Sequence, residues 1–336
     1  MRQIVLVTHP LVDGSLRLLE EHADLYELRI GPGLTDPEEL RRELRDVHAL
    51  IPNCAARVTT RALEGGERLK IVACCAMGYD NVDLAAATAR GIWVTNTPGA
   101  LTEATADLAW ALILAVTRHI VRGDRMVRDG RFTGWTPTLL LGMELTGKTL
   151  GVVGMGQIGR AVARRAVGFG MRVVYSDVAL CEQPELGGVK PQSVALEELL
   201  RRADIVTLHT PLSPATRHLI DASRLALMKP DAYLVNTSRG PVVDERALVE
   251  HLRAGRIAGA ALDVYEREPY APVAPGKDFR TLDNVIMTPH ISSSTREACD
   301  RVASRALRNI QLAEAGRYEA MDLLNPEVLV RLGRQR

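Results

Sequence analysis

The chain has 336 residues, of which 25% are charged, and its formal net charge at pH 7 is +1. This length suits two domains, and the balanced charge offers no electrostatic attraction to nucleic acid or to an anionic membrane. The longest apolar run, residues 108–116, has about half the length needed to cross a bilayer, and the N-terminus lacks the layout of a signal peptide. We therefore expect a cytoplasmic protein that acts on a small molecule and binds neither nucleic acid nor membrane.

The first hundred residues alternate strand-like runs with helical patterns. The strand-like runs occupy residues 4–7, 49–51, 70–73 and 92–94, and the helical patterns include residues 37–45 and 81–90. Alternation of this kind is typical of a parallel sheet with crossover helices. Residues 1–99 are thus predicted to form an α/β domain.

A long helical stretch from residue 101 to about residue 128 then interrupts this rhythm, so a domain boundary is expected near Pro98-Gly99. Strand–helix alternation resumes afterwards with strand-like runs at residues 150–153, 172–175, 205–208, 233–235, 259–262 and 285–287. Six strands in this order make a complete dinucleotide-binding domain. This second domain is predicted to span residues 100–291.

The final stretch, from residue 295, is helical, rich in arginine and too short for a domain of its own. We expect it to pack on the first domain, which then comprises residues 1–99 and 292–336. The predicted fold class is α/β, with two doubly wound parallel-sheet domains: a Rossmann domain that binds a dinucleotide and a flavodoxin-like domain that binds the substrate. A cleft is expected at the hinge where the chain crosses between them.

The five cysteines do not indicate a disulfide framework or a metal site. Their number is odd and they contain no C-x-x-C pair. We expect reduced thiols, mostly buried, at Cys54, Cys74, Cys75, Cys181 and Cys299.

A glycine-rich loop, Gly154-Met155-Gly156-Gln157-Ile158-Gly159, follows an apolar run and precedes a helical pattern. In a dinucleotide site the first glycine allows the tight turn, the second lets the backbone approach the pyrophosphate, and the third lets the helix pack on the strand. The helix N-terminus then favours the bound anion. Asp177 follows the next strand-like run, where a carboxylate binds the ribose hydroxyls and repels a 2′-phosphate. No Arg or Lys occurs in residues 178–187, so the sequence predicts NAD rather than NADP.

Three consecutive strand-like runs are followed by an arginine (Arg239), an acid cluster (Glu266 and Glu268) and a histidine (His290). Ligands bind beyond the carboxyl ends of the strands in a parallel sheet. Reduction of a 2-keto acid needs a cation for the carboxylate, a proton donor for the carbonyl oxygen, and a group that keeps the donor protonated. Arg, His and Glu are side chains that supply these three functions.

The chain resembles the D-isomer-specific 2-hydroxyacid dehydrogenases over nearly its whole length. Apart from the glycine loop, the matching segments are residues 78–83 (GYDNVD), 96–99 (NTPG), 103–109 (EATADLA), 236–240 (NTSRG), 263–269 (DVYEREP) and 288–291 (TPHI). The resemblance implies that Arg239 binds the substrate carboxylate, that His290 is the acid/base and that Glu268 is its partner. Glu266 is then a neighbour of the catalytic pair rather than part of it.

The resemblance implies further contacts as well. They are the backbone of Met77 and Gly78 with the substrate carboxylate, Thr105 and Asp263 with the nicotinamide, Thr237 and Ser238 in the same pocket, and His209, Thr210 and Pro211 along the dinucleotide. The other histidines are interpreted as structural. Residues from about 101 to 145 suit the family's dimer-forming arm, so a homodimer is expected, with Trp135 packed at the interface.

Within the family, the chain most resembles the glyoxylate and hydroxypyruvate reductases, which predicts a small 2-keto or 2-hydroxy acid as substrate. Two other functions stay open. Residues 134–137 and 145–151 are similar to phosphite (phosphonate) dehydrogenases, although those enzymes carry a lysine at the position of Met77. Some relatives are NAD-sensing transcriptional corepressors, and an intact Arg, Glu and His set does not exclude that role.

Overall fold

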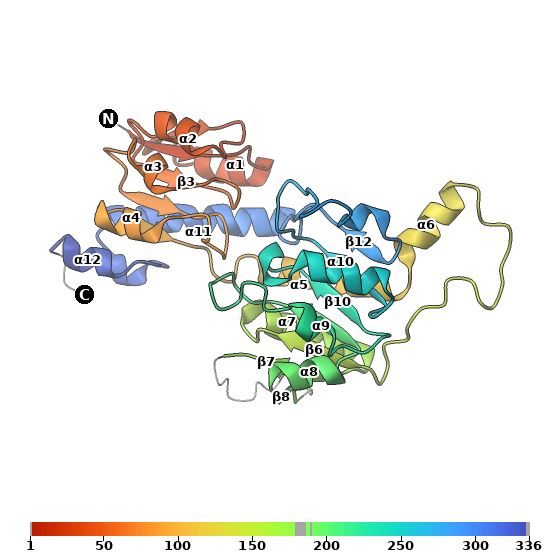
Figure 1. Ribbon diagram of the computed structural model, residues 1–336. Coiled ribbons are helices and arrows are strands. Elements are labelled where there is room, and N and C mark those ends of the chain that lie inside the picture. Colours follow the sequence, from red (N-terminus) through yellow and green to blue (C-terminus); the bar gives the residue numbers. More distant parts are fainter. Residues whose placement is uncertain (1, 179–185, 189, 334–336) are drawn as a thin grey trace. The chain divides into compact units, whose positions relative to one another are not determined.

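The structure is a computed structural model that describes residues 2–178, 186–188 and 190–333. The chain divides into two compact units, one formed by Met1–Leu101 with Ser293–Arg336 and the other by Thr102–Ser292. Each unit is built on a parallel sheet, which confirms the predicted fold class (Figure 1). Cys181 lies outside the described residues; Cys74 is a buried free thiol, Cys75 and Cys299 are partly buried free thiols, and Cys54 is exposed.

The sheet of the first unit has five strands in the order β2-β1-β3-β4-β5, which is the flavodoxin-like order. The strands are β1 (Gln3–Val7), β2 (Tyr26–Ile30), β3 (Ala49–Ile51), β4 (Ile71–Ala73) and β5 (Trp93–Thr95). Strand β2 was not predicted from the sequence. This edge strand carries Glu27 and Arg29 between its apolar residues, so it lacks the continuous apolar run of the central strands.

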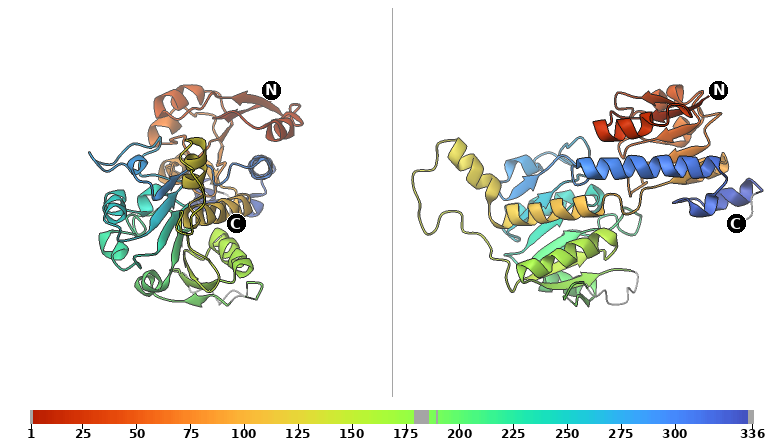
Figure 2. Two further views of the ribbon diagram at one scale, coloured as in Figure 1. Left: turned by 90° about the vertical axis from the view of Figure 1, so that its right-hand side faces the viewer. Right: turned by 180° about the vertical axis from the view of Figure 1, so that it is seen from behind.

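Helices cover both faces of this first sheet. One core contains Leu40, Leu63 and Ala87 from the three helices on one face, and a second core contains Leu19 and Leu307 on the other. The helices are α1 (Asp13–Glu20), α2 (Pro37–Glu43), α3 (Thr60–Leu63), α4 (Leu84–Ala89), α11 (Arg296–Glu314) and α12 (Glu327–Arg331), with a 3-10 turn η4 (Tyr318–Ala320). The long helix α11 packs beside α1 and β4, as can be followed in Figure 2.

The sheet of the second unit has seven parallel strands in the order β12-β11-β10-β9-β6-β7-β8. They are β6 (Thr149–Val153), β7 (Arg172–Ser176), β8 (Gln192–Ser193), β9 (Ile205–Leu208), β10 (Tyr233–Asn236), β11 (Gly259–Leu262) and β12 (Val285–Met287). The six predicted strands are present, and β8 is an additional two-residue strand whose exposed polar residues gave no strand pattern. The strand order reverses between β6 and β9, and dinucleotides bind beyond such a reversal in Rossmann sheets.

Helices also cover both faces of the second sheet. Side chains of α5 (Thr102–Thr117) and α7, such as Trp110 and Val162, belong to one core. Side chains of α8 and α10, such as Leu199 and Leu248, belong to the other. The elements are α7 (Gln157–Arg165), α8 (Leu196–Arg202), α9 (Ala222–Leu225) and α10 (Glu245–Arg253), with the 3-10 turns η1 (Ala166–Phe169), η2 (Gly240–Val242) and η3 (Phe279–Thr281).

The helical stretch predicted over residues 101–128 is present, but it is broken at one point. The structure has two helices, α5 (Thr102–Thr117) and α6 (Ile120–Arg128), which meet at an angle of 63°. The break occurs because His119 adopts a left-handed backbone conformation, with φ of 53°, which a right-handed helix cannot contain. Helix α6 and the segment after it project away from the rest of the second unit (Figure 1).

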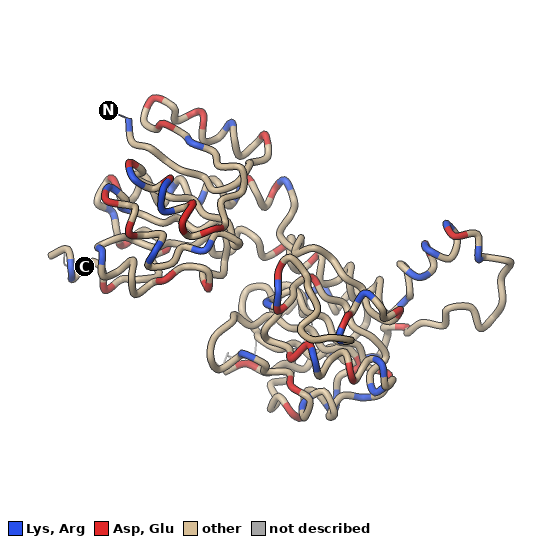
Figure 3. The backbone as a smooth tube through the Cα atoms, turned by 45° about the horizontal axis from the view of Figure 1, so that its top comes forward, with Lys and Arg blue, Asp and Glu red and all other residues tan. Residues whose placement is uncertain are grey.

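Over the described residues, no single helix is long and apolar enough to cross a membrane, and only the bent pair of α5 and α6 passes that test, when both are taken together. Basic and acidic residues are interspersed along both units (Figure 3).

Candidate active site

The glycine-rich loop connects β6 to α7 at the point where the strand order reverses. Gly154 has a φ of 91°, a conformation that residues with a side chain rarely adopt. A Cβ on Gly159 would lie 2.0 Å from the carbonyl oxygen of Gly154, so the close approach of helix and strand requires glycine. Gly156 caps α7 without a side chain, and the space beside it is open. The loop therefore presents bare backbone at a helix N-terminus, which fits a phosphate group.

Asp177 lies directly after β7, the strand beside β6. Its Oδ2 accepts a hydrogen bond of 2.6 Å from the N–H of Met155 within the glycine loop. This bond fixes a carboxylate at the edge of the loop, where the ribose next to a bound pyrophosphate would lie.

Three buried polar atoms after β9 and β10 have no hydrogen-bond partner among the described residues: His209 Nδ1, Thr210 Oγ1 and Thr237 Oγ1. The backbone of His209 touches the glycine loop, because a Cβ on Gly154 would lie 2.7 Å from its carbonyl oxygen. Burial lowers the pKa of His209 to about 3, so its ring is neutral. Buried polar atoms are normally paired in folded proteins. These atoms therefore indicate a place for a polar ligand along the glycine loop.

The turn that carries Arg239 is held by Asn236, the last residue of β10. Asn236 Oδ1 accepts hydrogen bonds from the N–H and the hydroxyl of Ser238 (3.0 and 2.8 Å), and its Nδ2 donates to the carbonyl of Arg239 (3.0 Å). Asn236 was not assigned a role from the sequence. An asparagine at the end of a strand often forms a hydrogen bond with the backbone two residues later, so its position could have indicated that it holds the turn.

Glu268 and His290 form a hydrogen-bonded pair. Nδ1 of His290 lies 2.8 Å from Oε2 of Glu268, while the other oxygen of Glu268 accepts from the N–H of Tyr265 (3.0 Å). Burial raises the pKa of Glu268, but the hydrogen bond and charge of His290, the Tyr265 N–H and the charge of Arg239 outweigh burial and hold this pKa below its usual value. Glu268 is thus an ionised partner that orients the imidazole.

Asp263 holds the backbone around His290. Its side chain is fully buried, and its oxygens accept hydrogen bonds from the hydroxyl of Thr288 (2.6 Å) and from the N–H groups of Ile291 and Ser292 (both 2.9 Å). Three donors of the His290 loop therefore converge on this carboxylate. The predicted approach of Asp263 to the nicotinamide stays a prediction.

The remaining predicted residues lie on the same elements or in the first unit. Thr105 is buried near the start of α5, and Gln157 and Ile158 begin α7. Met77 and Gly78 follow β4 in the first unit, where the Met77 carbonyl accepts a hydrogen bond of 2.9 Å from Asn96. Arg239, Glu268 and His290 follow the neighbouring strands β10, β11 and β12, so the second unit contains all three.

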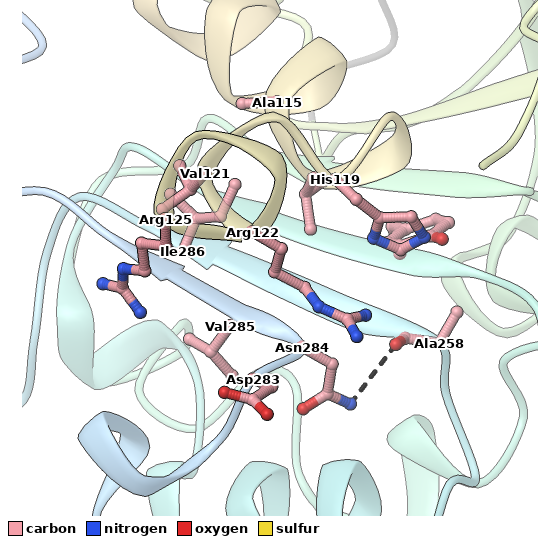
Figure 4. A pocket seen from close by; sticks show the side chains of 12 residues that line it. Ala115, His119, Val121, Arg122, Arg125, Ala258, Asp283, Asn284, Val285 and Ile286 are labelled. Atoms are coloured by element: carbon pink, nitrogen blue, oxygen red, sulfur yellow. Dashed lines mark hydrogen bonds between the residues drawn. The ribbon is translucent and has the colours of Figure 1, made fainter. Parts of the chain in front are cut away.

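A small pocket lies at the opposite, amino-terminal edge of the second sheet (Figure 4). It lies between α6 and the segments that precede β11 and β12, where Asn284 Nδ2 donates to the carbonyl of Ala258 (3.2 Å). Its volume is about 20 Å³, which accommodates about one water molecule. No predicted site residue lines it, so this pocket is not a candidate for the substrate site.

Comparison with known proteins agrees with this arrangement. Residues 110–292 match the family described as D-isomer specific 2-hydroxyacid dehydrogenase, NAD binding domain. A glyoxylate reductase of Thermococcus litoralis is 42% identical over 334 residues, which cover 98% of each chain. The crystal structure of the TT0316 protein of Thermus thermophilus has a TM-score of 0.86 and 44% identity, covering 96% of this chain and 100% of that one. The NADPH-dependent glyoxylate/hydroxypyruvate reductase of Sinorhizobium meliloti, solved with NADP and malonate, has a TM-score of 0.81 and 31% identity, covering 93% of each chain.

Proposed function

Because the chain belongs to the D-isomer-specific 2-hydroxyacid dehydrogenase family, we propose that it reduces a small 2-keto acid of the glyoxylate or hydroxypyruvate type with NADH. The observation that carries the proposal is the Glu268–His290 pair, with 2.8 Å between Oε2 and Nδ1. The two residues follow β11 and β12, and β11 lies beside β10, the strand that Arg239 follows. The chain is an oxidoreductase of 2-hydroxy acids, and its similarity to a glyoxylate reductase over nearly its full length supports a small keto acid.

The glycine loop fits the pyrophosphate of a nicotinamide dinucleotide. The N–H groups at the start of α7 would hold the phosphates, Asp177 would bind the ribose, and the unpaired atoms of His209, Thr210 and Thr237 would contact the rest of the cofactor. When bound, the nicotinamide supplies the hydride that the keto carbon receives.

The side chains of this protein position the substrate and move the proton. Arg239 binds the substrate carboxylate through its planar fork. Because Nδ1 of His290 is engaged by Glu268, Nε2 is the atom that gives a proton to the carbonyl oxygen. The ionised Glu268 stabilises the imidazolium before that transfer. The product is a 2-hydroxy acid, and His290 then regains its proton from solvent.

Cofactor choice follows from Asp177, and we propose NAD rather than NADP. A carboxylate at the ribose accepts hydrogen bonds from its hydroxyl groups and repels a 2′-phosphate. The Sinorhizobium meliloti relative is described as NADPH-dependent, so cofactor choice differs among these enzymes.

We also propose that the protein is a homodimer formed through the arm of residues from about 101 to 145. Helix α6 has no buried residue. Large apolar side chains are 49–79% exposed on this arm at Ile120, Val127, Phe132, Trp135 and Leu141. A second copy that covered them would remove this surface from water. The proposed location is the cytoplasm, which the free thiols of Cys74, Cys75 and Cys299 favour because thiols stay reduced there.

The direct test follows NADH oxidation with glyoxylate, hydroxypyruvate, pyruvate and a bulkier 2-keto acid, and NAD reduction with phosphite. Fast turnover of the two small keto acids, with a clear preference over the bulkier acid, is the expected result. Activity with phosphite alone would replace the proposal with phosphite oxidation. Tight NADH binding without turnover of any substrate would point to an NAD-sensing binding protein instead.

A further inference from the structure

Glu245, the first residue of α10, is a buried carboxyl group that the proposed reaction does not use. Its exposed fraction is 3%. Its Oε1 accepts a hydrogen bond of 2.7 Å from the N–H of Glu266, and its own N–H donates to Oε1 of Glu266 over 3.1 Å. Each glutamate therefore accepts a bond from the backbone of the other. We call Glu245 and Glu266 the glutamate clasp.

The clasp joins α10 to the segment that carries the catalytic glutamate. Glu268 stands two residues after Glu266 and pairs with His290. The turn that carries Arg239 packs against the same segment, since a Cβ on Gly240 would lie 1.8 Å from the carbonyl carbon of Tyr265 and 2.4 Å from the amide nitrogen of Glu266. A displacement of Glu266 would therefore disturb both Glu268 and the Arg239 turn.

The surroundings of Glu245 favour its neutral form. Burial raises the pKa of Glu245 to about 7, and the negative charges of Glu266 and Glu268 add to this effect, while the Glu266 N–H and the charge of Arg267 oppose it. His218 Nε2 lies 3.3 Å from Glu266 Oε1, without the geometry of a hydrogen bond. The titratable and charged groups on the segments packed around Glu245 are His218, Asp221, Arg224, Arg239, Tyr265, Glu266, Arg267, Glu268 and Tyr270.

We propose that Glu245 is a positioning residue of the active site: through the clasp it holds the Glu268 segment and the Arg239 turn in place, and its protonation state adjusts both. This inference rests on the proposed function, because it assigns the positioned groups their roles in keto-acid reduction. A neutral Glu245 accepts the Glu266 N–H without repulsion. An ionised Glu245 is repelled by the negative charges of Glu266 and Glu268, which loosens the segment.

Two substitutions separate the hydrogen bond from the charge. E245Q keeps an oxygen that accepts the Glu266 N–H and cannot ionise, whereas E245A removes the acceptor. E250Q is the matched control, since Glu250 is an exposed glutamate on the same helix that pairs with Lys277. The assay measures kcat and KM for NADH-dependent glyoxylate reduction between about pH 5.5 and about pH 9.

We expect E245A to lower kcat/KM about tenfold across this range, because a displaced catalytic group costs at least that much. E245Q should match the wild type at the acidic end and lose less activity than the wild type between about pH 6 and about pH 8. E250Q should follow the wild-type profile. A wild-type pH profile in E245Q would overturn the proposal. If E245A does not fold, the pH profile of E245Q still tests the proposal by itself.

A second measurement does not depend on turnover. In the chain labelled with carboxyl-¹³C glutamate, one signal that titrates near neutral pH should vanish in E245Q and persist in E250Q. If E245Q kept every signal that titrates near neutral pH, the inference would be contradicted. If the wild type reduces no keto acid, the proposed function fails, and this titration still tests the clasp by itself.

Discussion

The backbone N–H of His290 donates a hydrogen bond of 2.8 Å to the carbonyl oxygen of Asp263, the first residue after β11. The side chain of Asp263 meanwhile binds Thr288, Ile291 and Ser292, on either side of that histidine. His290 needs this support because its φ of 55° lies in the left-handed region, which costs a residue with a side chain about 1–2 kcal/mol. A neighbouring strand thus fixes the backbone of the proposed acid/base.

Asp263→Asn should weaken the His290 loop. An amide has one acceptor oxygen, so its NH₂ group would face one of the loop N–H donors, and an unsatisfied buried donor costs about 1–3 kcal/mol. We expect a lower thermal unfolding midpoint and a lower kcat with glyoxylate. Asp231→Asn, at an exposed site, is the control. If D263N kept both values of the wild type, Asp263 would not support His290.

His290→Gln should remove the proton donor while leaving a polar side chain of similar size. General acid catalysis contributes about 10²–10⁴-fold to rates, so kcat should fall by that factor. The KM for glyoxylate should change little, because Arg239 still binds the carboxylate. Steady-state kinetics at saturating NADH measure both constants. Full activity in H290Q would remove His290 from the mechanism.

Asp177→Asn tests cofactor choice. The amide oxygen can still accept the bond from the Met155 N–H, but the negative charge is gone. The ratio of kcat/KM with NADH to that with NADPH should fall about tenfold, the effect of about 1.4 kcal/mol. The KM for the keto acid serves as the internal control. An unchanged ratio would mean that another residue excludes the 2′-phosphate.

The pKa of Glu245 makes stability depend on pH. Its folded-state pKa of about 7 exceeds the usual 4.5, so the folded chain keeps a proton that the unfolded chain releases between these values. The free energy of unfolding should therefore decrease as pH rises from about 4.5 to about 7, by at most about 3 kcal/mol from this group. Thermal unfolding across this range should show a smaller decrease for E245Q than for the wild type. Parallel curves would contradict the shift.

Val127→Asp should dissociate the proposed dimer. Val127 is 63% exposed on α6, and a charge there would be costly to bury against a second copy. Light scattering after size exclusion should give a dimer mass for the wild type and a monomer mass for V127D. Leu25→Asp places the same charge at a residue that is 51% exposed in the first unit. A monomer mass for the wild type would contradict the dimer proposal.

Strand ends were predictable from the sequence because a parallel sheet places the residues after each strand at one edge. Arg239, the acid cluster of Glu266 and Glu268, and His290 were selected in this way, and they follow β10, β11 and β12. The choice of Glu268 over Glu266 came from the family resemblance. The break after α5 was not predictable, since it depends on the backbone of His119, and no glycine or proline marks that position.

The hydrogen-bond partners of buried polar side chains could not be predicted from the sequence pattern either. Asp263 was expected near the nicotinamide, and only the folded positions of Thr288, Ile291 and Ser292 show that its oxygens are occupied. The clasp of Glu245 and Glu266 joins residues 21 positions apart through their own backbones, which no motif spacing indicates.

The division of the chain at residues 101 and 292 separates the residues for proton transfer from two of the proposed substrate contacts. The proton-transfer pair and the arginine are encoded within Thr102–Ser292, whereas Met77 and Gly78, the proposed backbone contacts of the substrate, are encoded before it. A chimera could therefore take its first and last segments from a relative and retain the acid/base chemistry intact. In such a chimera, exchange of the first unit can change which keto acid is bound while the second unit stays unaltered.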